Sequence, residues 1–217
     1  MSDLRELLRG LEVFTGDPPR FDPGSAPGSP DGLFSQWLLG AVEAAVPAPH
    51  AMTLSTAGAD GTPSARVLIL KNVTANGWQF ATDAASAKGR DLAAWPYAAL
   101  TFHWQPLARQ VRVRGPVAAE SPERSAADFL ARSTAARAES LLGRQSSPLE
   151  DPAVRDRAVR ESRARLERDP ELVAPGWTLY TLRADEVEFW QGDRDRRHTR
   201  LVYRRTGSDW RKELLWP

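Results

Sequence analysis

The stretch Arg109–Ala119, RQVRVRGPVAA, indicates the fold class because its first half alternates apolar and charged residues. Val111 and Val113 alternate with Arg112 and Arg114, which is the period of a strand that buries one face and exposes the other. A strand of this kind is typical of an antiparallel sheet with one solvated side.

Further strand-like segments lie on both sides of this stretch, and several are separated by short turns such as Asp60-Gly61 and Asn76-Gly77. They are Ala51–Ala57, Ala65–Leu70, Trp78–Thr82, Ala98–Trp104, Trp177–Leu182, Val187–Gln191, Arg200–Arg205 and Trp210–Leu215. Short turns in place of regular crossover helices disfavour a doubly wound parallel sheet. We therefore expect a mainly β protein, a barrel or strongly bent sheet with peripheral helices.

Helical patterns occupy the rest of the chain. The first begins after Ser29 and carries an apolar stripe from Leu33 to Ala45. The others are expected at Ser86–Ala94, Pro122–Arg132, Ala135–Leu142 and Pro152–Arg168, the last being dense in alternating arginine and acidic residues.

Residues 1–31 form a Pro/Gly-rich arm with five prolines between Pro18 and Pro30. Such a segment is expected to be extended or disordered unless it docks on something. The spacing of Leu4, Leu7, Leu8 and Leu11 allows a short docking helix at its start. Residues 32–217 are expected to form a single domain.

Composition excludes several classes of protein. The 217 residues include no cysteine, so a disulfide framework and a thiol nucleophile are excluded. A net charge of +1 argues against a protein built to bind nucleic acid. There is no apolar run of about 18 residues, so we expect no membrane span. The N-terminal stretch MSDLRELLRG has no apolar signal core, so we expect a cytoplasmic protein.

Known motifs for nucleotides, serine hydrolysis and metals are missing. Neither G-x-G-x-x-G nor G-x-x-x-x-G-K-[ST] occurs, and there is no G-x-S-x-G. The three histidines, His50, His103 and His198, have no ligand spacing, so we expect no metal site.

The lysines are rare and therefore informative. Three of the 29 basic residues are lysines, and they are Lys71, Lys88 and Lys212. Lys88 and Ser86 lie at a predicted helix N-terminus, which is a natural anion site. Amides and hydroxyls at Gln110, Gln145 and Ser146 suit a polyhydroxyl chain or a heteroaromatic edge. Together they favour a phosphorylated, planar ligand, although Lys88 taken alone is more simply a solvated charge.

In combination these stretches resemble the pyridoxamine 5′-phosphate oxidases, which have the FMN-binding split β-barrel fold. The matching segments are RVLILK (66–71), FATDAASAK (80–88), LARQVRV (107–113), RQSS (144–147), VEFWQG (187–192), RRHTR (196–200) and the final residues 210–217. The resemblance covers residues 33–217 in register. It implies a homodimer with two FMN sites at the subunit interface, and a small-molecule substrate.

The resemblance also implies roles for individual residues. The cofactor-binding residues would be Arg66, Val67, Leu68, Ile69, Leu70, Lys71, Ala81, Thr82, Lys88, Gln110, Gln145, Ser146, Trp190 and Arg200. Lys71 and Arg132 would bind a substrate phosphate, and Arg196 and His198 would lie over the substrate ring as catalytic residues. The reaction implied is hydride transfer from pyridoxine or pyridoxamine 5′-phosphate to FMN, followed by reoxidation by dioxygen to give hydrogen peroxide and pyridoxal 5′-phosphate.

The sequence departs from the family pattern near both phosphates. Ala87 stands where the family has an arginine beside the phosphate-binding lysine. Asp128 and Ala136 stand where it has a tyrosine and a serine, and Arg137 is a candidate to compensate. Three alternatives therefore stay open: a split-barrel oxidase for a different ring, as in phenazine biosynthesis, a non-catalytic flavin- or pyridoxal-phosphate-binding protein, and a deazaflavin-dependent reductase.

Overall fold

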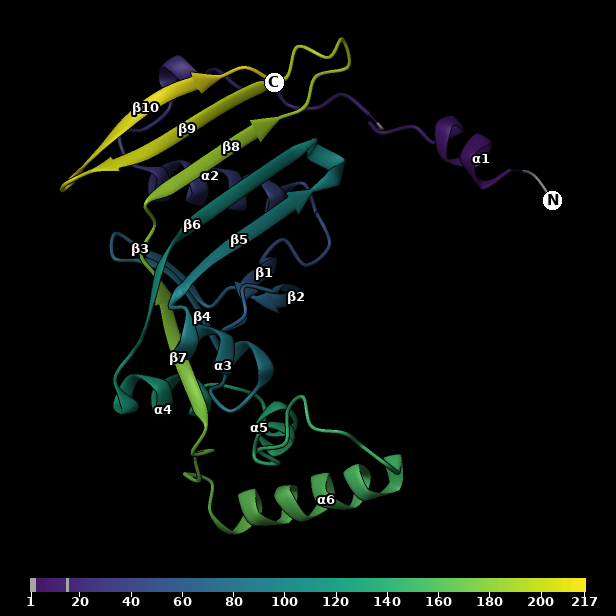
Figure 1. Cartoon of the computed structure of the whole chain (residues 1–217), viewed down its shortest axis with the longest axis vertical. Coiled ribbons are helices and arrows are strands. Elements are labelled where there is room, and N and C mark those ends of the chain that lie inside the picture. The colour runs from purple at the N-terminus through teal and green to yellow at the C-terminus, as the bar shows by residue number, and fades with distance from the viewer. Residues whose placement is uncertain (1–2, 15) are drawn as a thin grey trace. The chain divides into compact units, whose positions relative to one another are not determined.

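The computed structural model describes residues 3–14 and 16–217, which divide into two compact units. Unit 1 comprises Met1–His50, Thr101–Val113 and Glu186–Pro217, and unit 2 comprises Ala51–Leu100 and Arg114–Asp185. Strands β5 (Tyr97–Trp104) and β6 (Arg109–Ala119) contribute residues to both units. Figure 1 shows the elements of both units with their labels.

Unit 1 is built on the antiparallel strands β8 (Glu186–Gln191), β9 (Thr199–Thr206) and β10 (Asp209–Leu215), which lie side by side in Figure 1. Helix α2 (Pro30–Glu43) packs its apolar stripe on residues of this unit. Its Trp37 ring lies 5.2 Å from the ring of Phe189, and its Phe34 ring lies 4.8 Å from that of Phe102. Aromatic pairs of this edge-to-face kind stabilise a core beyond the apolar area that they bury.

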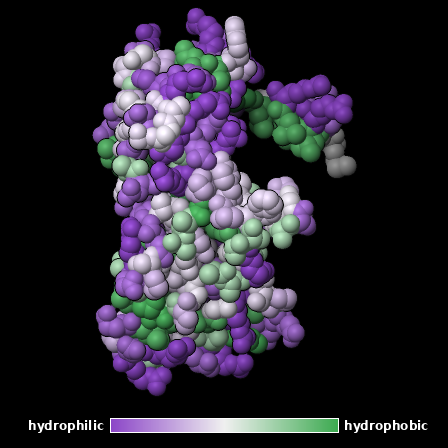
Figure 2. Space-filling view, turned by 60° about the vertical axis from the view of Figure 1, so that its left-hand side comes forward, coloured by the Kyte–Doolittle hydropathy of each residue, from purple (hydrophilic) through white to green (hydrophobic). Residues whose placement is uncertain are grey.

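The N-terminal arm has two parts that behave differently. Its second part docks on unit 1, where the Tyr203 hydroxyl donates to the Pro27 carbonyl over 2.8 Å and Lys212 donates to the Ala26 carbonyl over 2.8 Å. Its first part forms helix α1 (Leu4–Gly10), as the leucine spacing predicts, but buries none of its residues. Figure 2 shows α1 with both hydrophobic and hydrophilic surface exposed.

Unit 2 holds strands β1 (Ala51–Ala57), β2 (Pro63–Ile69), β3 (Asn72–Thr74), β4 (Gly77–Asp83) and β7 (Trp177–Leu182), with helices α3 (Ala87–Ala94), α4 (Pro122–Leu130), α5 (Thr134–Ser140) and α6 (Pro152–Arg168). Strand β1 pairs antiparallel with β2, and β7 pairs antiparallel with both β4 and β6. Phe80 stacks on Tyr180 across β4 and β7, and α4 sets Phe129 against Trp177.

The expected antiparallel architecture with peripheral helices is confirmed, and each predicted strand and helix is present within a few residues of its expected bounds. The sequence reasoning missed β3, because three residues are too few to display an alternating pattern. A single domain over residues 32–217 stays a prediction. Among the described residues, no helix is both long and apolar enough to cross a membrane.

Candidate functional site

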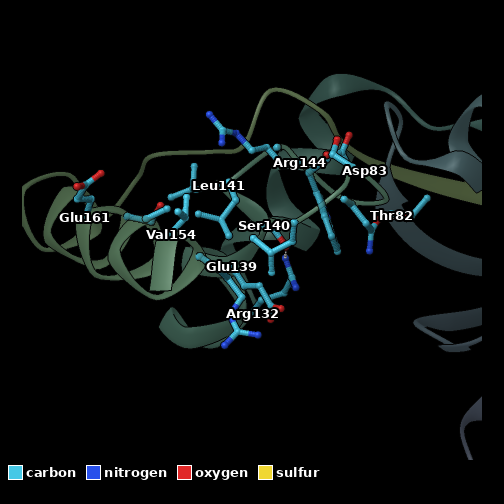
Figure 3. A pocket seen from close by; sticks show the side chains of 18 of the residues that line it. Thr82, Asp83, Arg132, Glu139, Ser140, Leu141, Arg144, Val154 and Glu161 are labelled. Atoms are coloured by element: carbon cyan, nitrogen blue, oxygen red, sulfur yellow. Dashed lines mark hydrogen bonds between the residues drawn. The ribbon is translucent and has the colours of Figure 1, made fainter. Parts of the chain in front are cut away.

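A cavity of about 1270 Å³ lies within unit 2. Its lining comes from strand β2 and the following Lys71, strand β4, Arg132 after the end of α4, the end of helix α5, the segment that joins α5 to α6, helix α6 and the first residue of β7. In Figure 3, Thr82 and Asp83 of β4 lie on one side of the cavity and Glu161 and Val154 of α6 on the other, with Arg132 beside Ser140. Its volume exceeds the range usual for small-molecule pockets.

Lys88 lies in the first turn of α3, and the helix begins at the Ser86 cap that the sequence predicts. Ser86 is the helix cap, fully buried, and its hydroxyl accepts from the Gly89 amide over 3.2 Å. Gly89 allows close packing here, since a Cβ at this position would collide with the carbonyl of Ala84. The Lys88 side chain is therefore fixed in the first helical turn, where the helix dipole favours an anion.

The ammonium group of Lys88 has only uncharged hydrogen-bond partners. It donates to Thr82 Oγ1 over 3.2 Å, to Ser86 Oγ over 3.3 Å and to Gln145 Oε1 over 3.1 Å. The residue is 6% exposed, and among the described residues no carboxylate forms an ion pair with it. We call Thr82, Ser86, Lys88 and Gln145 the Lys88 cluster.

Burial lowers the pKa of Lys88, with a smaller contribution in the same direction from the charge of Arg66. The carboxylates of Asp83 and Asp91 raise it by smaller contributions. A buried ammonium group without a counterion is unfavourable, so the cluster suits a negatively charged ligand.

The loop after α5 brings Gln145 and Ser146 to this cluster. Gln145 Oε1 also accepts from Thr82 Oγ1 over 3.1 Å, and Ser146 Oγ accepts from the Ala87 amide over 3.3 Å. Ser146 has a φ of 71°, a conformation that few residues other than glycine adopt. The Gln145-Ser146 pair therefore contacts the first residues of α3.

A second lysine at the cavity has a different environment. Lys71 Nζ lies 3.3 Å from Asp128 Oδ1, and Asp128 Oδ2 accepts from the indole nitrogen of Trp177 over 2.9 Å. The guanidinium carbon of Arg132 lies 3.8 Å from the centre of the Trp177 ring, and Arg132 Nη1 donates to Ser140 Oγ over 2.8 Å. We call Lys71, Asp128, Arg132 and Trp177 the Lys71 cluster.

The remaining predicted residues of β2 differ in exposure. Val67 is 66% exposed and Ile69 is 43% exposed, whereas Leu70 is buried. Arg66 donates to Thr56 Oγ1 over 2.7 Å and forms an ion pair with Asp91 at 3.7 Å. Exposed aliphatic side chains beside a cavity suit an apolar ring or a subunit contact.

Eight of the predicted site residues line this cavity: Val67, Leu68, Ile69, Lys71, Ala81, Thr82, Arg132 and Gln145. Lys88 donates to Gln145, which lines the cavity, and Ser146 lies between the lining residues Gln145 and Ser147. Arg66 and Leu70 do not line it. Arg137, considered as a compensating ligand for a phosphate, instead donates to the backbone carbonyls of Pro170 and Leu172 and is not among the lining residues.

The other five predicted residues, Gln110, Trp190, Arg196, His198 and Arg200, belong to unit 1. The rings of Trp190 and His198 lie 5.1 Å apart, and His198 Nδ1 accepts from the Asp193 amide over 3.0 Å. Arg196 is exposed and has a φ of 65°.

Arg200 and Gln110 lie on the strands of unit 1. Arg200 is paired with the buried carboxylate of Glu188 at 2.8 Å, an interaction that raises its pKa. Gln110 is half-buried on β6.

Sequence reasoning missed three residues that contact predicted site residues. Trp177 is predicted only as the first residue of a strand, yet it lines the cavity and contacts both Asp128 and Arg132. Ser140 binds Arg132, but nothing in the local pattern marks it. In unit 1 the arm residue Phe14 lies 6.3 Å from the Trp190 ring and 6.0 Å from the His198 ring. No periodic signal in the Pro/Gly-rich arm indicates this contact.

Comparison with known proteins identifies the family. Residues 38–174 match the family model described as pyridoxamine 5′-phosphate oxidase, and residues 177–217 match the pyridoxine 5′-phosphate oxidase C-terminal dimerisation region. A relative from Paraburkholderia phymatum named pyridoxine/pyridoxamine 5′-phosphate oxidase is 39% identical over 208 residues, 96% of this chain and 95% of its own. One of the same name from Nitrobacter winogradskyi is 40% identical and covers 100% of both chains.

Solved structures agree with this. PhzG from Burkholderia lata, determined in complex with tetrahydrophenazine-1-carboxylic acid, superposes with a TM-score of 0.86 at 30% identity, covering 93% of this chain and 100% of its own. A protein from Nostoc punctiforme described as pyridoxamine 5′-phosphate oxidase-related and FMN-binding shares the fold, with a TM-score of 0.68 at 21% identity over 87% of this chain and 98% of its own. The chain therefore belongs to the pyridoxamine 5′-phosphate oxidase family of split β-barrel oxidases.

Proposed function

We propose that the chain is an FMN-dependent oxidase that acts on a planar ring substrate, with pyridoxine or pyridoxamine 5′-phosphate as the first candidate. The relatives that carry this name are about 40% identical over nearly the whole chain, which supports the candidate. The products would be pyridoxal 5′-phosphate and hydrogen peroxide, with ammonia released in addition when the substrate is the amine and water hydrolyses the imine.

The observation that carries the cofactor assignment is the Lys88 cluster. A buried ammonium group whose partners are two hydroxyls and one amide oxygen lies in the first turn of α3. A phosphate monoester placed there would supply the missing counterion and would accept hydrogen bonds from the same groups. The residues present therefore fit the phosphate of FMN.

The proposed roles of the protein follow from the groups at the cavity. When bound, FMN would supply a ring that accepts hydride and that dioxygen can reoxidise. Lys88, with Thr82 and Gln145, would hold the phosphate, and the exposed aliphatic residues of β2 would lie along the ring. Arg66, Leu68, Leu70, Ala81 and Ser146, with Gln110, Trp190 and Arg200, complete the proposed cofactor-binding set.

On the substrate side, Arg196 and His198 would orient the ring and assist its loss of a proton. The contact from the Asp193 amide leaves Nε2 of His198 as the nitrogen available to a substrate. Lys71 and Arg132 would contact a substituent of the substrate ring, which is the phosphate in the first candidate.

We also propose a homodimer with FMN at the subunit interface. Residues 177–217 match a dimerisation region, and in unit 1 this segment exposes Leu214 by 65% and Trp216 by 92%. Large exposed apolar side chains of this kind are typical of a surface that a partner covers. A cytoplasmic location stays a prediction from the sequence.

A second candidate is an oxidase of the same fold for a ring without phosphate. The observation that favours it is the ion pair between Lys71 and Asp128, which occupies a lysine expected to bind phosphate. PhzG, bound to a carboxylated tricyclic ring, is a structural neighbour with this kind of ligand.

The test is to purify the protein, identify the flavin that copurifies, and follow peroxide after addition of pyridoxamine 5′-phosphate. We expect stoichiometric FMN and turnover that requires it. Arg90→Gln, on the exposed face of α3, serves as the matched control and should leave both unchanged. FMN without turnover of any ring would favour a non-catalytic flavoprotein, and a copurifying deazaflavin would contradict the cofactor assignment.

A further inference from the structure

In the Lys71 cluster, the carboxylate of Asp128 lies beside Lys71, the lysine that lines the cavity. Asp128 lies on α4 and contacts Lys71 with one oxygen and the Trp177 indole with the other. The two charged side chains are only 27% and 14% exposed, for Lys71 and Asp128 respectively. Both oxygens of Asp128 are thus engaged, and the pair is largely shielded from solvent, so screening weakens it less than a surface pair.

The other cation of the cluster is also engaged. Arg132 lies against the Trp177 ring and donates to Ser140, and burial lowers its pKa while the carboxylates of Asp128 and Glu139 raise it. Lys71 and Arg132 therefore face two carboxylates, and the local charge is balanced.

This balance sets what the cluster can recognise. A phosphate monoester carries up to two negative charges, so it would have to compete with Asp128 for Lys71 and would lie close to a like charge. A ring with an uncharged substituent at the same point meets no such repulsion. The Lys71–Asp128 pair therefore reduces the gain in binding affinity that a phosphate group would otherwise give a ligand.

We propose that Asp128 is a specificity-determining residue that removes the preference of this cavity for a phosphorylated ring. The chain then accepts ring substrates with and without a phosphate with comparable affinity. The proposal rests on the proposed function, since it concerns the substrate of that flavin site.

The variant that isolates this effect is Asp128→Asn. An asparagine keeps an oxygen that accepts from Trp177 and removes the charge beside Lys71. Glu161→Gln is the matched control, because Glu161 lines the same cavity from α6 and forms no ion pair in the described part of the chain.

The experiment titrates the FMN-loaded protein with 4-deoxypyridoxine and with 4-deoxypyridoxine 5′-phosphate, two rings that differ by the phosphate and cannot be oxidised at the reacting carbon. Binding is followed by the flavin absorbance spectrum. We expect affinities within about threefold of each other for the wild type, and a preference for the phosphorylated ring of about tenfold or more in Asp128→Asn. Glu161→Gln should keep the wild-type ratio.

The ratio separates specificity from structural damage, because a merely structural role would change both affinities together. An unchanged ratio in Asp128→Asn overturns the proposal, as does a wild type that already prefers the phosphorylated ring by more than about thirtyfold. Failure of the proposed function would look different, since the protein would then copurify without flavin or produce no peroxide with any ring.

Discussion

Two lysines of unit 2 adjoin one cavity and have opposite environments. Lys88 is buried, and within the described part of the chain its ammonium group contacts only hydroxyl and amide oxygens. Lys71 is partly exposed, and its ammonium group is paired with the carboxylate of Asp128. One lysine lacks a counterion that a ligand could supply, while the other already has one.

This difference shows that counting cations around a cavity does not predict which phosphates it binds. Burial without a counterion is costly, so the Lys88 cluster gains from an anion. The Lys71 cluster gains little, because an anion there must displace or tolerate Asp128. Substitutions at or beside the two lysines should therefore have different effects.

The largest effect is expected from Lys88→Met. Removing the ammonium group should weaken FMN binding by about 100-fold or more, because a buried charge-assisted contact to phosphate is lost. Quenching of flavin fluorescence during titration of the apoprotein measures this. The affinity for riboflavin, which has no phosphate, should stay within a few fold of the wild type, and an equal loss for both flavins would argue against a phosphate contact at Lys88.

A smaller effect is expected from Lys71→Met, and its size should depend on Asp128. In the wild type we expect the affinity for a phosphorylated ring to fall by about threefold, since the lysine is already paired. In an Asp128→Asn background the same change should cost about tenfold or more. Independent effects of the two substitutions in this double-mutant cycle would contradict the coupling.

A gain is expected from Ala87→Arg, which adds a second cation beside Lys88 at the N-terminus of α3. Because Ala87 is half-buried and its amide donates to Ser146 next to Lys88, we expect FMN affinity to rise by about two- to fivefold. Calorimetric titration with FMN measures it. Arg90→Gln, three positions along the same helix, should leave the FMN affinity unchanged.

The smallest effect concerns the stability of the apoprotein. Since burial lowers the pKa of Lys88 in the folded state, the unfolded chain binds the proton more tightly, and the charged lysine destabilises the fold at neutral pH. Lys88→Met should therefore raise the free energy of unfolding at pH 7. The difference from the wild type should shrink as the pH rises toward the ordinary lysine value of 10.5. Urea unfolding of both proteins across this range tests it, and a difference that grows with pH would contradict the assignment.

The sequence predicted the parts of this site that local patterns encode. Alternation in Arg109–Ala119 gave the antiparallel strand β6, and the Ser86 cap placed Lys88 at a helix N-terminus. It did not predict the pair between Lys71 and Asp128, because the contact joins the end of β2 to α4 and no pattern specifies how those elements pack.

Long-range packing also explains two other differences. Trp177 resembles a core residue in the sequence, yet its first position on β7 sets it at the cavity beside Arg132. Arg137 looked available for a phosphate, but the backbone carbonyls of Pro170 and Leu172 take its donors. In both cases the partner lies far away in the chain, where spacing rules give no information.

The two lysine environments together predict that this site recognises the phosphate of its cofactor and not that of its substrate. One calorimetric series on the wild type tests it: FMN against riboflavin on the apoprotein, then 4-deoxypyridoxine 5′-phosphate against 4-deoxypyridoxine on the FMN-loaded protein. We expect the first ratio of affinities to be at least about 100 and the second to lie within about threefold of one. Two ratios of similar size would contradict the account.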